Sequence, residues 1–259
     1  EVYVKINGNS FRLKGSGNTT FEYLFKAVTS DIPFQFLAGG YHSNYYTLKA
    51  LPQPKVVDLN IFLNYPSYTN IKDESIKNNG DLIVPEGTIV HWEASVQNTK
   101  NVTLVFPKSK HRQSTNKTFS YKKQFFINTP YQIIIQNEHS LSDSLSYFIK
   151  VIPDAFPLIK VSQGLDSTNT QFLFSGEIED DYLLQKLTFN YRITSNDTNP
   201  LVSKQIEIKR LSKELFFFTF KYDELQLATG GEVEYYFEVW DNDDINGSKS
   251  TKSTRFLYK

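Results

Sequence analysis

The chain has 259 residues, and because its 28 Lys and Arg residues offset 28 Asp and Glu residues, its formal net charge is zero, which argues against a nucleic-acid-binding protein. The absence of cysteine excludes disulfides, thiolate metal sites and cysteine nucleophiles. Hydrophobic residues make up 39% and aromatic residues 15% of the chain, a composition typical of a globular protein rich in β-strands.

Short strands are predicted throughout the first 52 residues. Val2–Ile6 and residues 11–14 flank an Asn-Gly dipeptide, which favours a hairpin turn because both positions tolerate positive φ. Further strands are expected over residues 20–27 and 32–38. Since this length is about half of a sandwich domain, residues 1–52 are predicted to be a partial immunoglobulin-like β-module that is truncated at its N-terminal side.

One strand-and-linker phrase occurs twice, as YTLKALP at residues 46–52 and as YFIKVIP at residues 147–153. Tandem β-modules end in this way, with an alternating apolar strand that stops at proline. The repeat predicts an immunoglobulin-like sandwich over residues 55–153, with a polar loop at 64–79, and another sandwich over residues 154–259. Proline fixes φ and lacks an N–H donor, so the links between modules are expected to be short and stiff.

Apolar side chains alternate along several stretches, which predicts strands with one face in a core. The predicted inward sets are Val90, Trp92, Ala94 and Val96; Phe172, Phe174, Gly176 and Ile178; and Val233, Tyr235, Phe237 and Val239. No stretch shows the apolar spacing of an amphipathic helix. The predicted fold class is therefore all-β, with tandem immunoglobulin-like antiparallel β-sandwiches joined by short Pro-containing linkers.

Acidic residues gather in two loops of the third module. They are Glu179, Asp180 and Asp181 after its second strand, and Asp241, Asp243 and Asp244 after its sixth. These two loops emerge at the same end of an immunoglobulin-like sandwich, so the carboxylates are expected to meet. Oxygen ligands in that number suit Ca²⁺, and these residues form a candidate calcium site; no other cofactor is expected. The alternative is that Asp and Asn cap turns in solvated loops.

Two aromatic features of the third module also permit two interpretations. Trp240 lies on the outward parity of its strand, so it is a candidate contact residue for a partner, unless it covers a neighbouring strand. Residues 215–220 read Leu-Phe-Phe-Phe-Thr-Phe, and the lining of a ligand groove is one interpretation of this run. A buried strand is the preferred interpretation, because short continuous apolar runs usually lie in a core.

Signatures of known enzyme classes are missing from the sequence. Its four histidines do not show HExxH spacing, and the chain has no GxSxG motif, phosphate-binding glycine loop or dinucleotide fingerprint. We therefore predict a non-enzymatic protein without a small-molecule substrate. A hydrolase built on the acidic loops is a further hypothesis, which would require two carboxyl groups about 5–9 Å apart in a solvent-filled cleft.

Four short phrases together resemble a large family of envelope proteins typical of Bacteroidota. They are GDLIVPEGT at 80–88, YPSYT at 65–69, EDDY at 179–182 and WDND at 240–243. The resemblance implies immunoglobulin-like modules in the periplasm of a longer protein, anchored in the inner membrane by N-terminal helices that lie outside this chain. It implies partners among other envelope proteins but no activity. Asp-Ser pairs at Ser144 and Ser167 are similar to O-glycosylation acceptors of Bacteroidota envelope proteins.

These observations favour a non-enzymatic spacer and protein-interaction segment of a membrane-anchored envelope protein. The predicted stiff links and the missing catalytic motifs support that function. A surface adhesin or carbohydrate-binding β-sandwich is the alternative, and exposed aromatic side chains in a groove would favour it.

Overall fold

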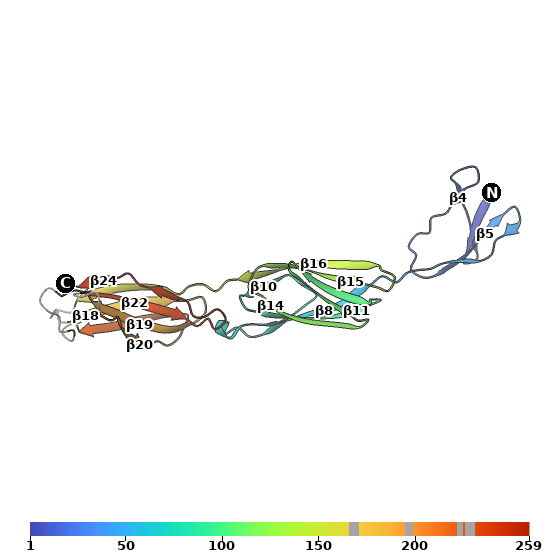
Figure 1. Cartoon of the computed structure of the whole chain (residues 1–259). Coiled ribbons are helices and arrows are strands. Elements are labelled where there is room, and N and C mark those ends of the chain that lie inside the picture. The colour runs from blue at the N-terminus through green and yellow to red at the C-terminus, as the bar shows by residue number, and fades with distance from the viewer. Residues whose placement is uncertain (166–170, 195–198, 222–224, 226–230, 259) are drawn as a thin grey trace.

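The computed structural model describes the chain except for residues 166–170, 195–198, 222–224, 226–230 and 259. Three β-modules follow one another in an elongated molecule whose two termini lie at opposite ends (Figure 1). Strands make up the regular structure apart from 3-10 turns such as η1 (Ser67–Thr69). Within the described residues, no helix has the length and apolar character needed to span a membrane.

The first module is one antiparallel sheet with a small hairpin beside it. The sheet contains β1 (Val2–Ile6), β2 (Asn9–Arg12), β5 (Ile32–Ala38), β6 (Tyr41–His42) and β7 (Tyr46–Leu48), and the hairpin pairs β3 (Lys14–Gly15) with β4 (Phe21–Glu22). The predicted hairpin turn is confirmed, because Asn7 and Gly8 have φ angles of 48° and 87°. Val4 and Leu13 are the buried apolar side chains of this module, so its core is small.

The strand predicted over residues 20–27 is wrong beyond the two residues of β4. The ring of Tyr23 contacts that of Phe11, with centroids 5.8 Å apart, and Phe25 contacts Phe34 at 5.3 Å. This segment therefore packs aromatic rings onto the sheet where a strand would have offered backbone hydrogen bonds.

The second module is a two-layer sandwich. One sheet has the order β10 (Leu82–Pro85), β16 (Ser142–Ile152), β15 (Thr129–Gln136), β12 (Asn101–Phe106) and β13 (Ser109–Ser114); the other has the order β14 (Thr118–Gln124), β11 (Ile89–Gln97), β8 (Lys55–Asn64) and β9 (Glu74–Lys77). All pairs are antiparallel except β10 with β16. The polar loop predicted at 64–79 is partly wrong, since it contains η1 and the edge strand β9.

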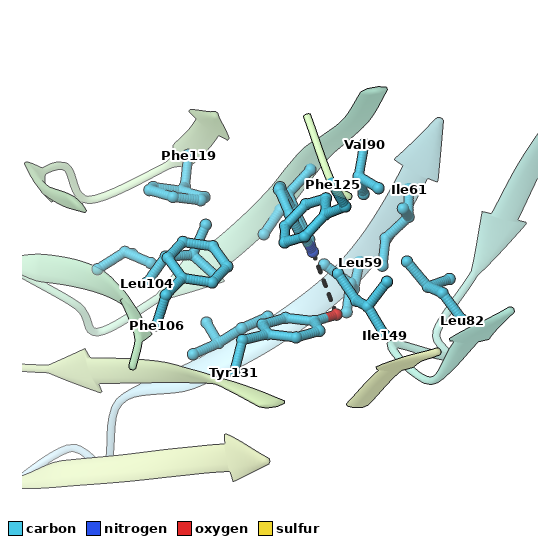
Figure 2. Packing of buried hydrophobic residues seen from close by; sticks show 14 of the residues in the cluster. Leu59, Ile61, Leu82, Val90, Leu104, Phe106, Phe119, Phe125, Tyr131 and Ile149 are labelled. Atoms are coloured by element: carbon cyan, nitrogen blue, oxygen red, sulfur yellow. Dashed lines mark hydrogen bonds between the residues drawn. The ribbon is translucent and has the colours of Figure 1, made fainter. Parts of the chain in front are cut away.

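The core of the second module surrounds Trp92, whose side chain is 0% exposed. Phe106, Phe125 and Tyr131 contact the indole ring, and Figure 2 shows these three side chains converging between the two sheets. The indole Nε1 donates a hydrogen bond to the Tyr131 hydroxyl, 3.2 Å away. The inward set predicted for this strand is confirmed, because all four of its side chains are buried.

Tyr131 ties the two sheets together through its hydroxyl group, which donates to the carbonyl of Gly80 at 2.8 Å and accepts from Trp92. Replacing Tyr131 by Phe is expected to lower the free energy of unfolding by about 1–3 kcal/mol, because a buried donor and a buried acceptor lose their partner. Urea unfolding of the full chain measures this. Tyr235 is the matched control: its hydroxyl donates to the Gln163 side chain and has no second hydrogen-bond partner among the described residues, so its change to Phe should cost less.

The third module is also a two-layer sandwich. One sheet has the order β17 (Leu158–Leu165), β18 (Gln171–Glu179) and β21 (Lys213–Lys221); the other contains β20 (Val202–Ile206), β19 (Leu184–Ile193), β22 (Val233–Asp241), β23 (Ser250–Lys252) and β24 (Phe256–Tyr258). The predicted inward residues of β22 are all buried. In β18, Gly176 is required by close packing, since a Cβ there would lie 2.3 Å from the Phe216 ring and 2.8 Å from the Lys160 carbonyl. The predicted all-β class of tandem antiparallel sandwiches is confirmed.

The apolar run at residues 215–220 is not a fully buried strand. Phe216 and Phe220 face the core, whereas Leu215 and Phe217 are 65% and 78% exposed. The reason is that β21 is the edge of a three-stranded sheet with only one face against the other layer. The sequence prediction was therefore wrong for the outward residues of this strand.

Candidate functional site

The two acidic loops of the third module lie against the end of the second module. Tyr68, on η1 of the second module, packs its ring edge-on against Tyr182, with centroids 5.1 Å apart. The side-chain amide of Asn242 donates to the Tyr68 carbonyl at 2.9 Å, and that of Asn246 donates to Glu86 at 3.0 Å. Residues 153–157 connect the modules here, and we call this link with its contacts the second joint.

Four buried carboxyl groups converge at the second joint. They belong to Asp154 of the linker, Asp180 after β18, and Asp241 and Asp243 at the end of β22. The exposed Asp181 lies beside them and accepts a hydrogen bond from the backbone N–H of Ala155 at 3.3 Å. We call these five carboxyl groups, together with Lys249, the junction cluster.

Backbone N–H groups hold the loop carboxylates in place. Asp241 Oδ1 accepts from the N–H of Asp243 at 3.2 Å and from that of Lys249 at 2.8 Å. Asp243 Oδ1 accepts from Ile245 and Asn246, as Asp commonly does in turns. These turns direct the second oxygen of each side chain toward the ammonium of Lys249. Asp241 Oδ2 lies 4.0 Å and Asp243 Oδ2 3.1 Å from Lys249 Nζ.

Lys249 connects the linker to the loop after β22. Its ammonium also forms an ion pair with Asp154, and its side chain is only 18% exposed. Burial alone would lower the pKa of Lys249, but hydrogen bonds to Asp154 and Asp243 outweigh it and raise that pKa to about 12. Burial dominates at Asp154, whose pKa is raised despite the ion pair. Lys249 is thus a fixed cation among carboxylates that are costly to ionise.

Two buried oxygens of the junction cluster find no hydrogen-bond partner among the described residues. They are Asp180 Oδ1 and Asp241 Oδ2. Burial is the largest cause that raises the pKa of Asp180 to about 6, and the neighbouring Asp181, Asp241 and Asp154 raise it further. Burial also raises the pKa of Asp241. The joint therefore contains more negative charge than its own hydrogen bonds and ion pairs offset.

Replacing Asp180 by Asn is expected to raise the unfolding temperature in chelator at about pH 7, by roughly 4 °C. The folded-state pKa of Asp180 lies above its ordinary value of 3.8. Its favourable contribution to stability is therefore complete below about pH 4 and is lost as the pH rises through about 6. Calorimetry of the variant and the parent should show a difference that shrinks toward about pH 5. A difference independent of pH would contradict this assignment.

The structure brings together only part of the predicted calcium site. Asp180, Asp181, Asp241 and Asp243 belong to the junction cluster, but Glu179 points outward to Lys213 at 3.0 Å. Asp244 accepts a hydrogen bond from Ser67 of the second module. Among the described residues, no three acidic or histidine side chains are already placed to hold a metal ion.

Trp240 is half-buried, and the Lys186 ammonium lies 4.8 Å from the centre of its ring. The glycosylation candidate Ser144 is exposed on β16, and its N–H donates to Asp143. The other candidate, Ser167, lies outside the described residues.

Asp154 and Lys249 were missed by sequence reasoning. One signal was available for the linker residue: Pro153 of the repeated phrase is followed by Asp154, whereas Pro52 of the first copy is followed by Gln53. Nothing in the sequence indicated that Lys249 would reach the linker. Their contact forms only when the end of the third module and the linker come together.

The first joint, at residues 52–54, is neutral and has fewer described contacts. Amide groups of Asn98 and Asn137 donate to the backbone carbonyls of Gln53 and Pro52. A polar cavity of about 650 Å³ lies beside it, lined by Pro52, Asn98, Thr99, Lys100, Thr115, Asn116, Asn137, Glu138 and His139. This lining contains no Trp, Tyr or Phe and no cluster of carboxylates, so the charged joint is the stronger candidate site.

No protein-family model and no curated protein matches the chain. Among solved structures, the chain is similar to part of a 1.5-MDa bacterial ice-binding adhesin, at 12% identity over 68% of this chain and 59% of that one, with a TM-score of 0.36. It is similar to a Ca²⁺-stabilized adhesin with which an Antarctic bacterium binds ice, at 9% identity over 97% and 63% of the two chains, with a TM-score of 0.34.

A third similar structure is that of the FN1–FN3 domains of chicken CNTN1, at 9% identity over 99% of this chain and 89% of that one, with a TM-score of 0.27. The chain spans less than two thirds of the length of both adhesin structures. At these identities the likeness concerns only the fold, that of tandem β-sandwich modules.

Proposed function

We propose that this chain is a non-enzymatic spacer and protein-interaction segment that holds two neighbouring modules at a fixed distance and angle. The second joint is the observation that carries the proposal. It combines the buried ion pair of Lys249 and Asp154, the edge-on contact of Tyr68 with Tyr182, and two hydrogen bonds that the third module donates to the second. Relative motion of domains is the usual expectation unless such contacts oppose it.

Close packing at the second joint supports the same function. Gly87 has a φ of 87°, and a Cβ at that position would lie 3.2 Å from Ile245 of the third module and from Pro66. A side chain at this position would therefore press against the neighbouring module. The space around Gly87 is therefore too small for a side chain, and this close approach of the two modules opposes bending of one sandwich against the other.

The place of action belongs to the proposal as well. The resemblance of four short phrases to Bacteroidota envelope proteins supports a periplasmic location, with membrane anchoring through segments outside this chain and with other envelope proteins as partners. Calcium within the second joint would suit a structural role there, because extracellular modules bind it through several oxygen ligands, with Kd on the order of 10⁻⁴–10⁻³ M.

The test is a pair of distance measurements between spin labels. The chain contains no cysteine, so a label at Lys122→Cys in the second module and one at Ser203→Cys in the third are the only attachment sites. A narrow distance distribution across the second joint is expected, even in chelator. The control pair, Ser10→Cys with Lys122→Cys, spans the first joint and should give a broader distribution. A broad distribution for the pair across the second joint would refute a rigid second joint.

A second candidate function is ligand binding by the first module. Its sheet presents partly exposed aromatic rings, with Phe11 42%, Phe36 37% and Tyr46 50% exposed, and Phe34 stacks on Tyr46 with centroids 5.7 Å apart. Such rings offer a face to an adhesion ligand such as a carbohydrate. A glycan array probed with the chain and with Tyr46→Ala tests it; signal that survives the substitution, or no signal, would count against this candidate.

A further inference from the structure

The junction cluster contains an excess of buried negative charge. Three of its four buried carboxyl groups, those of Asp154, Asp241 and Asp243, lie within ion-pair distance of the Lys249 ammonium, and among the described residues the fourth, that of Asp180, forms no ion pair. Removing a charged group from water is costly unless another charge or several hydrogen bonds compensate for it. An enclosed joint with uncompensated carboxylates therefore favours the entry of a further cation.

The unpartnered oxygens show where such a cation would bind. Asp180 and Asp241 are 8% and 1% exposed, and each uses one oxygen to accept backbone hydrogen bonds, which fixes the side chain. The other oxygen of each is buried and accepts no hydrogen bond from the described residues. Asp241 Oδ2 lies 4.0 Å from the Lys249 ammonium, which also contacts Asp154. Unsatisfied buried oxygens are rare in native proteins, and a bound ion is one of their recognised explanations.

We propose that Ca²⁺ binds in the second joint through Asp154, Asp180 and Asp241, and that the Lys249 ammonium takes the place of this ion in the metal-free chain. The inference deepens the proposed function, since it names a ligand that would hold the rigid joint. The three carboxylates come from the linker and from the loops after β18 and β22, so a bound ion would fasten the linker to the third module.

The chemistry of the joint selects among divalent cations. Ca²⁺ accepts six to eight oxygen ligands in flexible geometry, whereas Mg²⁺ requires a near-ideal octahedron and gives up its water reluctantly. With Lys249 displaced, the Asp154 carboxylate and the fixed Asp241 Oδ2 are free to contact an ion, and Asp181 at the rim offers a further carboxylate. Flexible coordination of this kind favours Ca²⁺ over Mg²⁺.

The first experiment is a calcium titration of the full chain after removal of metals, with the unfolding temperature as the readout. We expect Ca²⁺ to raise that temperature by about 5 °C, with half of the effect at about 0.1–1 mM. Asp180→Asn and Asp241→Asn should each abolish the increase, while their amide oxygens can still accept the backbone hydrogen bonds. Glu179→Gln is the matched control, because Glu179 faces Lys213, and it should respond like the parent.

The second experiment uses Lys249→Met, which removes the competing ammonium. The concentration of Ca²⁺ that gives half of the effect should fall at least about tenfold, because a positive charge that contacts Asp154 and lies 4.0 Å from Asp241 Oδ2 no longer opposes binding. Mg²⁺ at the same concentrations should act more weakly.

Two results would overturn the inference. One is an unfolding temperature of both the parent and Lys249→Met that does not change up to about 10 mM Ca²⁺. The other is an increase that persists in both Asp180→Asn and Asp241→Asn, which would place the ion elsewhere. A narrow spin-label distribution in chelator would still support the rigid spacer in either case, so failure of the calcium site and failure of the proposed function are distinguishable.

Discussion

Replacing Lys249 by Met is expected to lower the free energy of unfolding of the third module by about 3 kcal/mol in chelator. Methionine retains much of the apolar stem but removes the ammonium that faces Asp154, Asp241 and Asp243. The carboxylates then stay buried without a counter-charge, which is the costly outcome when one partner of a buried ion pair is deleted. The estimate is at the low end of the range for such pairs because the lysine side chain remains 18% exposed.

Urea unfolding followed by tryptophan fluorescence measures this change, because Trp240 lies in the third module and contributes to the signal together with Trp92. Lys213→Met is the matched control: Lys213 forms ion pairs with Glu177 at 2.6 Å and Glu179 at 3.0 Å, but on the exposed face of the sheet. Water screens exposed pairs of this kind, so the control should barely change the stability. Equal losses in the two variants would contradict a special role for the buried cluster.

Replacing Trp92 by Ala is expected to lower the free energy of unfolding of the second module by about 3–5 kcal/mol. The indole is fully buried between the sheets, where it contacts Phe106, Phe125 and Tyr131. Truncation leaves a cavity that the surrounding strands can only partly fill, and the Tyr131 hydroxyl loses a donor.

Circular dichroism is the suitable readout for that variant, since the substitution removes the tryptophan of the second module. Trp240→Ala provides the comparison in the third module. Trp240 is half-buried on the outer face of its sheet, so its truncation should cost about 1 kcal/mol. A smaller loss for Trp92→Ala than for Trp240→Ala would mean that the indole is not the centre of the core.

The cores could be predicted because the side-chain period of a strand is visible in the sequence. Val233 and Val239 lie on the same face of β22 as the aromatic residues between them, and this face is buried throughout. The period is less informative where the two faces of a strand carry side chains of similar polarity. Polar β9 pairs with β8 at an edge, and the continuous apolar run of β21 concealed its two different faces.

Only part of the candidate site could be predicted from the sequence. Alternation already places Glu179 on the opposite face from the buried Ile178, so its exclusion could have been inferred. Asp154 and Lys249 are different, because 95 positions separate them and they meet only when the third module docks against its linker. A sequence pattern contains no information about such a contact, whereas the convergence of the two loops follows from sandwich topology.

The most direct test of a rigid second joint held by the junction cluster is the distance between labels at Lys122→Cys and Ser203→Cys, measured in chelator with and without Lys249→Met. The parent should give a narrow distribution, and the loss of the ammonium should broaden it, while Lys213→Met in the same background should leave the width unchanged. A distribution that is equally narrow with and without Lys249 would contradict the role assigned to this cluster, and one that is broad in the parent would contradict the rigid joint itself.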